Sequence, residues 1–154
     1  MQQTDDAIRK ACTEVIRKRT LKRPSYPLST IFETEDMTAT KVAAHITGQD
    51  GELPIVLVYD DADSWNLLTT QRVISTIKGE RKEAPAASIS KYTWKDYKGY
   101  RENAYIFGHL TLADKSQLDI LIETGVPSSI MIYGIMTITD LYKSLEQPTE
   151  KTPS

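Results

Sequence analysis

The sequence predicts an α+β fold, in which a meander of antiparallel strands is capped by a long C-terminal helix and preceded by an added N-terminal helix. Three observations lead to this class. Apolar residues recur at helical spacing near both ends of the chain, strand-like runs fill its middle, and short polar links join those runs. With 154 residues, 40% of them hydrophobic and 26% charged, the chain has the size and composition of a single globular domain.

Residues 4–20 are predicted to form an amphipathic helix. Thr4 is a candidate N-cap, and acidic residues in the first turn with basic residues in the last complement the helix dipole. The stripe expected to face the rest of the protein consists of Ala7, Ile8, Ala11, Cys12, Val15 and Ile16. As the sole cysteine, Cys12 is expected to be a buried apolar side chain. A lone cysteine and a polar, acidic N-terminus unlike a signal peptide favour a cytoplasmic protein.

The segment that follows this helix is predicted to contain two short elements. Pro24 and Pro27 prevent the helix from continuing. Residues 28–32 favour a strand. Residues 36–46 favour a weaker second helix, which would end before Gly48. Its inward-facing residues are expected to be Met37 and Ala44, with Val42 as a further candidate.

Six strand-like runs form the central part of the chain. They are rich in β-branched and aromatic residues, which favour strands. We expect strands at residues 55–59, 65–69, 72–77, 84–94, 104–112 and 117–123. The polar links between them, including KGERKE before residue 84, are short enough for successive hairpins. The sheet should therefore be an antiparallel meander.

Residues 128–145 are predicted to form the capping helix. Met131, Ile135, Ile138, Tyr142 and Leu145 recur at spacings of three and four, which gives a continuous stripe. The β-branched residues and an internal glycine lower helix propensity, so a strand is the alternative. The apolar part is shorter than the roughly 20 residues that a membrane span needs. Residues 147–154 are polar and are expected to form a flexible tail.

Two segments resemble hairpins of bacterial pleckstrin-homology-like (PH-like) domains. The first is residues 63–75, DSWNLLTTQRVIS. As in many hairpins of that family, an aromatic residue is followed in order by alternating aliphatic residues, Leu-Thr, two variable residues, Arg and Val-Ile. Residues 110–125 give Leu-Thr-Leu, Asp-Lys and then LDILIETG, similar to the last hairpin before the helix of that family. The resemblance covers residues 53–145. It implies a seven-stranded barrel closed by a C-terminal helix, a scaffold widely used for docking.

The resemblance divides the chain into an N-terminal helical extension packed on the domain (1–48), a PH-like domain (49–146) and the tail (147–154). The extension lies outside the barrel and supplies at most one of its strands. Lipid-binding members of the wider family carry several Lys and Arg residues in the first hairpin, and this sequence has no convincing equivalent. The resemblance therefore does not imply phosphoinositide binding.

The sequence carries no recognised catalytic signature, so we expect a non-enzymatic protein without a cofactor or metal. It lacks a G-x-S-x-G elbow, a phosphate-binding glycine loop and an H-E-x-x-H pair. His45 and His109 fall on different predicted elements and are expected to be surface or packing residues. Asp60, Asp61 and Asp63 lack the further ligands of a calcium loop and favour a solvated turn.

Charge is segregated along the chain. Residues 9–23 hold seven basic residues and one acidic residue, whereas residues 33–63 hold eight acidic residues and one basic residue. The candidate partner-binding residues are Glu33, Glu35, Asp36, Asp60, Asp61 and Asp63. If either block is functional, it should steer a charged partner. Mutual screening of the two blocks and simple solvation are the alternatives.

Three classes of function remain. The favoured class is a protein-binding module, including by analogy an immunity-type protein that neutralises a toxin domain. The second is a membrane-surface or lipid-headgroup binder that uses the basic residues within 17–23 or 78–82. The third is a small enzyme with an unrecognised site. Nucleic-acid binding is disfavoured, because the net charge of −2 and the pI of about 5.7 outweigh the aromatic and basic residues between 91 and 105.

Overall fold

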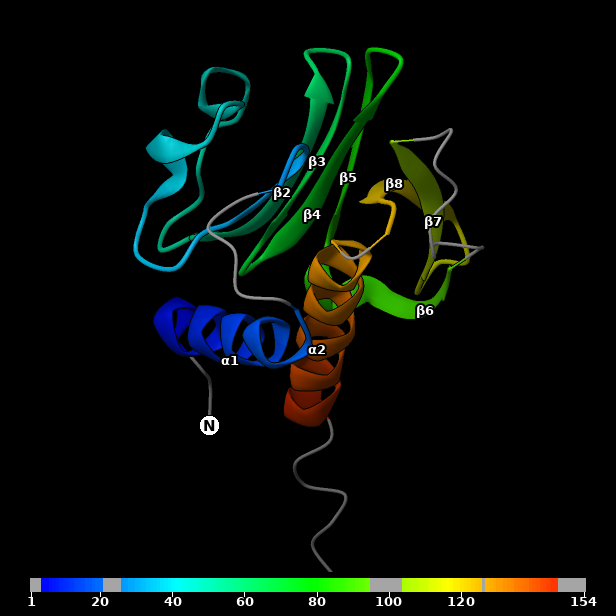
Figure 1. The fold of residues 1–154 in the computed structure, drawn as a ribbon. Coiled ribbons are helices and arrows are strands. Elements are labelled where there is room, and N and C mark those ends of the chain that lie inside the picture. Colours follow the sequence, from blue (N-terminus) through cyan, green and yellow to red (C-terminus); the bar gives the residue numbers. More distant parts are fainter. Residues whose placement is uncertain (1–3, 21–25, 95–103, 126, 147–154) are drawn as a thin grey trace, which may run out of the picture.

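The computed structural model describes residues 4–20, 26–94, 104–125 and 127–146, and within them the predicted α+β class is confirmed (Figure 1). The helices are α1 (Asp5–Arg19) and α2 (Ser128–Glu146). The strands are β1 (Ser29–Ile31), β2 (Pro54–Asp61), β3 (Ser64–Thr69), β4 (Arg72–Ile77), β5 (Glu80–Pro85), β6 (Ile89–Trp94), β7 (Tyr105–Leu112) and β8 (Gln117–Glu123). They form two antiparallel sheets, in the orders β1-β2-β3-β4-β5 and β6-β7-β8.

The N-terminal helix follows the prediction closely. The Thr4 side chain accepts a hydrogen bond from the backbone N–H of Ala7 and so caps α1. Ile8, Cys12 and Ile16 are buried as expected, but Ala7 is exposed. The stripe also contains Arg9, which the apolar pattern missed. Its Nη1 atom donates to the backbone oxygens of Glu35 (2.5 Å) and Pro54 (3.2 Å).

Helix α2 packs on α1 and on both sheets, which makes it a principal part of the core. Met131, Ile135 and Ile138 are fully or almost fully buried, and the predicted helix is confirmed. A Cβ atom at Gly134 would lie 3.0 Å from Leu68 and 3.5 Å from Ile16. Glycine at this position therefore permits a close approach of α2, which outweighs its poor helix propensity. In the described part of the chain, no helix is both long enough and apolar enough to cross a membrane.

The prediction of one strand over residues 84–94 is wrong. The chain instead forms β5 and β6, joined by the short 3₁₀ helix Ala86–Ser88, so that one expected meander becomes two sheets. The link KGERKE is the hairpin turn and most of β5. Periodicity missed this strand because its first four residues are charged and exposed. Exposed charges are typical of a sheet edge that avoids pairing with another chain.

The predicted helix over residues 36–46 is also wrong. Two 3₁₀ turns, Met37–Ala39 and Ala43–His45, replace it. The Asp36 carboxylate caps the first turn, and β-branched Thr40 and Val42 between the turns disfavour a continuous helix. Val42 is buried against the outer face of the five-stranded sheet, whereas Ala44 is exposed. The predicted strand over residues 28–32 is confirmed as β1, which pairs with β2.

Side chains of the five-stranded sheet bind the free edge of β8. The Asn66 side-chain oxygen accepts a hydrogen bond from the backbone N–H of Leu121 (2.5 Å), and the Ser75 hydroxyl donates to the backbone oxygen of Asp119 (2.7 Å). Asn66 and Ser75 are cross-strand partners on β3 and β4. The two sheets are therefore joined by directional contacts as well as by apolar packing.

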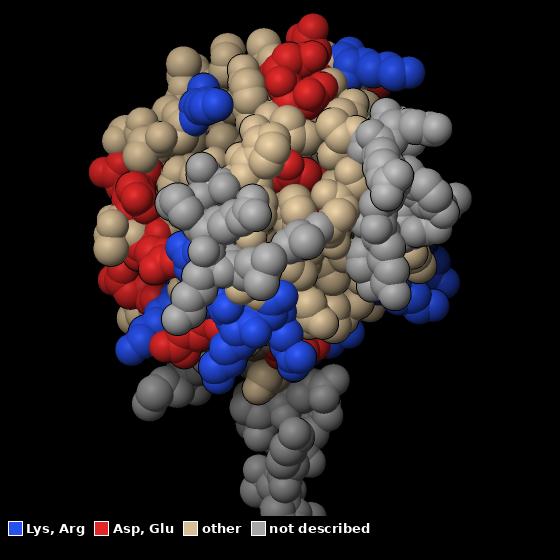
Figure 2. All heavy atoms as spheres, viewed as in Figure 1, with Lys and Arg blue, Asp and Glu red and all other residues tan. Residues whose placement is uncertain are grey.

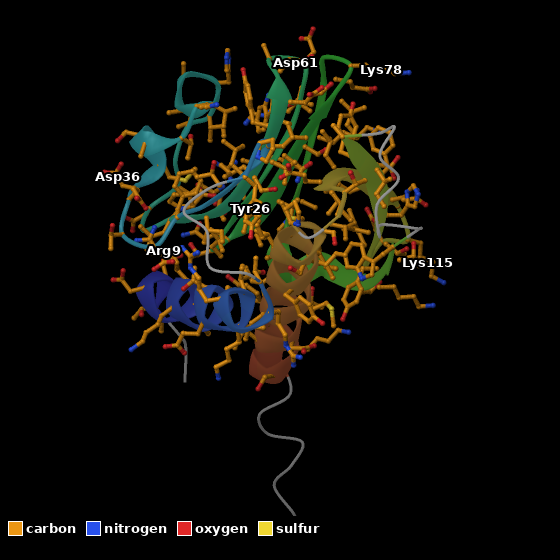
Figure 3. All side chains as sticks on the ribbon, viewed as in Figure 1. Arg9, Tyr26, Asp36, Asp61, Lys78 and Lys115 are labelled. Carbon is orange, nitrogen blue, oxygen red and sulfur yellow. The ribbon has the colours of Figure 1, made fainter. Side chains whose placement is uncertain are left out.

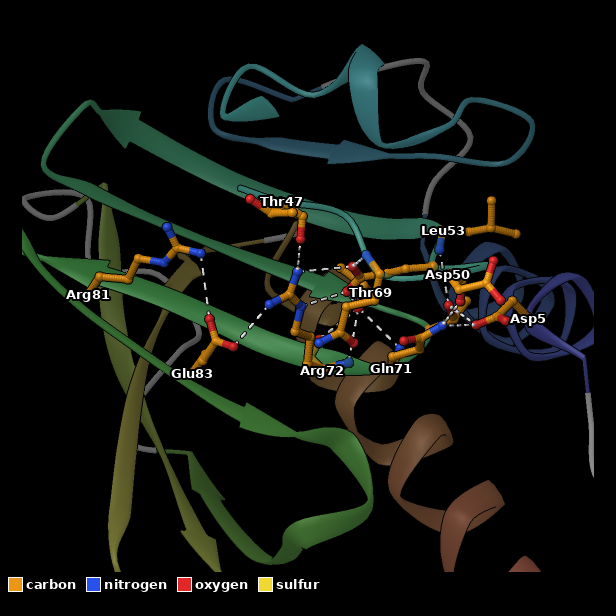
Figure 4. A network of polar contacts seen from close by, with 12 residues as sticks. Asp5, Thr47, Asp50, Leu53, Thr69, Gln71, Arg72, Arg81 and Glu83 are labelled. Carbon is orange, nitrogen blue, oxygen red and sulfur yellow. Dashed lines mark hydrogen bonds and ion pairs between the residues drawn. The ribbon is translucent and has the colours of Figure 1, made fainter. Parts of the chain in front are cut away.

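The turn between β3 and β4 is held by a buried polar network (Figure 4). Arg72 donates to the Glu52 carboxylate at 2.8 and 3.1 Å, to the Glu83 carboxylate at 2.9 Å and to the backbone oxygen of Thr47 at 2.8 Å. The Thr69 hydroxyl donates to the same Glu52 carboxylate at 2.6 Å. This network fixes the segment before β2 against β4 and β5.

The same turn also contacts both helices. The Asp5 carboxylate accepts hydrogen bonds from the Thr70 hydroxyl (2.5 Å) and the Gln71 side chain (3.1 Å). The Tyr142 hydroxyl donates to the backbone oxygen of Thr70 (2.6 Å). The beginning of α1 and the later part of α2 are thus tied to one turn of the sheet.

We expect Glu52→Gln to lower the free energy of unfolding by about 3 kcal/mol, because Arg72 would lose its buried charged partner. Glu33→Gln is the matched control. Its ion pair with Arg17 is largely exposed, so the expected loss is about 0–1 kcal/mol. Urea denaturation of both variants measures the difference, and equal losses would contradict the structural role of Glu52.

The stability difference between wild type and Glu52→Gln should also depend on pH. Burial opposes ionisation of Glu52, but hydrogen bonds from Arg72, Thr69 and the backbone of Gln49 outweigh it and hold its pKa below the ordinary value. A lowered folded-state pKa stabilises the protein above the unfolded pKa of about 4.3, and this contribution is lost as pH falls through the folded value. The difference should therefore shrink below about pH 4. A difference that stays constant from pH 7 to pH 3 would be inconsistent with this assignment.

Candidate functional site

The tips of the β2–β3 and β4–β5 hairpins lie side by side at the end of the molecule away from α2 (Figure 1), and we call this region the hairpin end. The backbone N–H of Gly79 donates to the oxygen of Asp63 at 3.0 Å and links the two tips. Lys78 and Gly79 have φ angles of 53° and 81°, as expected for a tight two-residue hairpin turn. Two rigid hairpins therefore present their turn residues together.

Three of the six predicted partner-binding residues lie at this end. Asp60, Asp61 and Asp63, which we call the acidic turn, are exposed. Asp61 accepts a hydrogen bond from the backbone N–H of Asp63 (2.9 Å), and no side chain of the acidic turn forms an ion pair within the described residues. Figure 2 shows acidic atoms gathered at the position where Figure 3 labels Asp61, with Lys78 beside it. These carboxylates are available to a partner.

The other three predicted residues are placed elsewhere and serve the fold. Strand β2 separates the two groups, because Ile31 pairs near its beginning and Asp61 is its last residue. Glu33 forms an ion pair with Arg17, and hydrogen bonds from backbone N–H groups lower the pKa of Glu35. Hydrogen bonds from the hydroxyl and backbone of Thr38 lower the pKa of Asp36. In Figure 3, Asp36 lies well away from Asp61.

The hairpin end carries a hollow on the outer face of the five-stranded sheet, which we call the outer hollow. Its volume is about 360 Å³. It is lined by His45, Ala62, Asp63, Trp65, Thr76, Gly79 and Arg81. Trp65, Thr76 and Arg81 are successive cross-strand partners, so their side chains share this face. The outer hollow is therefore continuous with the acidic turn through Ala62 and Asp63.

A second hollow of about 400 Å³, the inner hollow, lies between the β4–β5 hairpin and β8. It is lined by Ser75, Ile77, Lys78, Glu80, Lys82, Gln117, Leu118 and Asp119. Beside it, the His109 ring lies 2.6 Å from the Asp119 carboxylate, which also accepts a hydrogen bond from Gln117 at 2.9 Å. Burial opposes ionisation of Asp119, yet its contacts with Gln117 and His109 lower its pKa. Two lysines and two carboxylates line this hollow, so their charges balance.

Three of the five described residues of the basic block are engaged within the protein, whereas Lys10 and Lys18 are exposed. Arg9 is buried, Arg17 pairs with Glu33, and the Arg19 guanidinium lies 5.3 Å from the centre of the Tyr133 ring. Lys22 and Arg23 lie outside the described residues. Mutual screening, one of the alternatives to a partner site, applies to the Arg17–Glu33 pair.

Other candidates for chemistry are accounted for locally. Burial raises the pKa of the Cys12 thiol to about 12, so this thiol remains protonated, as expected of a packing residue. Among the described residues, no group of three His, Cys, Asp or Glu side chains is arranged to hold a metal ion. The rings of Tyr92 and Trp94 stack with centroids 5.2 Å apart and pack on the core. The remaining aromatic and basic residues between 95 and 103 lie outside the described residues.

Sequence reasoning found the acidic turn but missed both hollows. The outer hollow combines residues from the 3₁₀ turn Ala43–His45, from β3, β4 and β5 and from the two hairpin turns, and β5 was predicted as a link. Comparison with protein-family models, curated proteins and solved structures gives no match for this chain. Function is therefore argued from the hairpin end itself.

Proposed function

We propose that the protein is a non-enzymatic protein-binding module, and that the hairpin end docks a partner with a basic surface. The observation that carries this proposal is the placement of Asp60, Asp61 and Asp63 together on one exposed tip without a described basic partner. Within this class we include an immunity-type protein, which neutralises another protein by stoichiometric binding.

The contrast between the two acidic groups supports this role. Glu33 is neutralised by Arg17, while Glu35 and Asp36 accept hydrogen bonds from their own loop. The acidic turn has no comparable use in the fold beyond the Asp61–Asp63 contact. Unpaired surface carboxylates raise the local concentration of cationic partners and speed their association.

We also propose that the scaffold is PH-like. The order of four strands (β2–β5), three strands (β6–β8) and a C-terminal helix agrees with the seven-stranded ground plan of that family. Helix α1 and strand β1 are then additions from the N-terminal extension. Because binding sites vary widely on one fold, the scaffold supports docking in general, and the partner's charge is argued from the hairpin end.

Membrane-surface binding is the less favoured alternative. It requires a cluster of free cations, yet Arg9, Arg17 and Arg19 are engaged within the protein, which leaves only Lys10 and Lys18 among the described basic residues of α1. The buried residues of α1 pack into the core, so this helix has no free apolar stripe to insert into a bilayer. The Lys78–Lys82 region is interrupted by Glu80 and adjoins the acidic turn.

We expect the association rate with the native partner to fall as salt concentration rises, and Asp60→Lys with Asp61→Lys to slow it at least about tenfold at low salt. The partner would be recovered from the native host on the immobilised protein, and the rate measured by stopped-flow fluorescence. The double variant should lose little thermal stability, since both side chains are exposed and the hydrogen bond that Asp61 accepts from the Asp63 backbone lies in an exposed turn.

A matched control is the reversal of two exposed carboxylates on the helices, Glu14→Lys with Asp140→Lys. It changes the net charge by the same amount at the opposite end of the molecule, so it should slow association much less. If both double variants slowed association equally, the slowing would come from net charge and not from the position of the acidic turn. A rate independent of salt would contradict the electrostatic role of the acidic turn.

We expect little co-sedimentation of the protein with anionic liposomes at physiological salt. Each free Lys or Arg near such a surface contributes about 1 kcal/mol, and the described arginines of α1 are not free. Liposomes of neutral lipid serve as the control. Strong sedimentation with anionic liposomes, lost when Arg17, Lys18 and Arg19 are changed to Glu, would favour the membrane alternative over protein docking.

A further inference from the structure

We propose that the outer hollow receives one basic side chain, a lysine or an arginine, from the partner protein. This inference rests on the proposed function and adds the chemistry of its central contact. The acidic turn would attract the partner, and the outer hollow would hold a single side chain of it. Such anchoring residues, buried in a pocket and surrounded by weaker contacts, account for most of the binding energy of many protein interfaces.

The unpaired charge of the outer hollow is a hydrogen-bond acceptor. The Asp63 carboxylate is exposed at its rim and forms no ion pair among the described residues. The Arg81 guanidinium, which also lines the hollow, is already used. It donates to the backbone oxygen of His45 and lies 3.5 Å from the Glu83 carboxylate. The cation of the hollow is thus paired internally, whereas Asp63 is not.

Thr76 supplies an independent observation on the same face. Only 6% of this residue is exposed, and its hydroxyl has no hydrogen-bond partner among the described residues. Its cross-strand partners Trp65 and Arg81 also line the outer hollow. Buried hydroxyls are nearly always hydrogen-bonded in folded proteins, so an unpartnered one at a hollow indicates a missing hydrogen-bond partner, and the Thr76 oxygen can accept from a cationic donor. A ligand that reaches Thr76 would satisfy it.

These groups together select a cationic ligand. Lysine and arginine side chains offer only donors at their ends, and their aliphatic stems suit the lining residues Ala62, Gly79 and Trp65. The nearby charges of Asp60 and Asp61 reinforce the preference. A carboxylate ligand would instead be repelled by Asp63. Arg81 would offset this repulsion only in part, because it already contacts His45 and Glu83.

The test is an NMR titration of the ¹⁵N-labelled full chain with four small amides. The amides of Nα-acetyl-lysine and Nα-acetyl-arginine are charged only at the end of the side chain. The amides of Nα-acetyl-norleucine and Nα-acetyl-citrulline are their neutral counterparts. We expect saturable shifts of the Trp65 indole and the backbone N–H groups of Asp63 and Gly79 with the two cations. The neutral amides should bind at least fivefold more weakly.

Thr76→Val and Asp63→Asn should each weaken binding of the cationic amides at least threefold. Thr139→Val is the matched control, since Thr139 on α2 also has a buried hydroxyl without a described partner but lies away from the outer hollow. It should leave binding unchanged. Neither threonine variant removes a hydrogen bond, so both should fold, and the dispersion of the spectrum reports this directly.

Equal binding of charged and neutral amides, wild-type binding by Thr76→Val and Asp63→Asn, or shifts confined to other regions would each overturn the inference. Its failure is distinguishable from failure of the proposed function. Salt-dependent association with the partner alongside no amide binding would refute the outer hollow alone. Amide binding at the outer hollow alongside salt-independent association would refute the electrostatic docking proposal.

Discussion

The buried contact between Arg72 and Glu52 is the interaction on which the other parts of this structure depend. It lies at the start of β4, where the chain leaves a turn that also binds Asp5 of α1 and Tyr142 of α2. Two charged side chains that are 9% and 0% exposed require mutual hydrogen bonds to offset the loss of water. The contact therefore specifies a single arrangement of the loop before β2, the β3–β4 hairpin and β5.

That arrangement determines the geometry of the hairpin end. Arg72 fixes β5 through Glu83, and the same Glu83 carboxylate lies beside Arg81 of the outer hollow. Arg81 in turn donates to the backbone of His45, so the loop over the sheet closes one wall of the hollow. The acidic turn lies on the neighbouring hairpin, linked by the Gly79–Asp63 backbone contact. A rigid sheet, rather than a long loop, thus holds the candidate binding groups.

Helical periodicity and cap residues were sufficient to predict α1 and α2 almost to the residue, and β3 and β4 followed from their apolar alternation. Strand β5 could not be predicted in this way, because charged residues at a sheet edge resemble a polar link. Glu52 was counted with the acidic surface block, although it is buried. Its partner is 20 positions away in sequence, and nothing local indicates the contact. The acidic turn was evident from charge, but the outer hollow needed the register of three strands.

The most direct test of the account is site-specific photo-crosslinking in the native host, with benzoylphenylalanine placed at Ala62 or, as the control, at Lys115. Ala62 lies within the acidic turn, whereas Lys115 lies in the β7–β8 turn away from it (Figure 3). We predict a discrete covalent adduct from position 62, lost when Asp60→Lys and Asp61→Lys are added, and none from position 115. An adduct from position 115 with none from position 62 would contradict docking through the hairpin end.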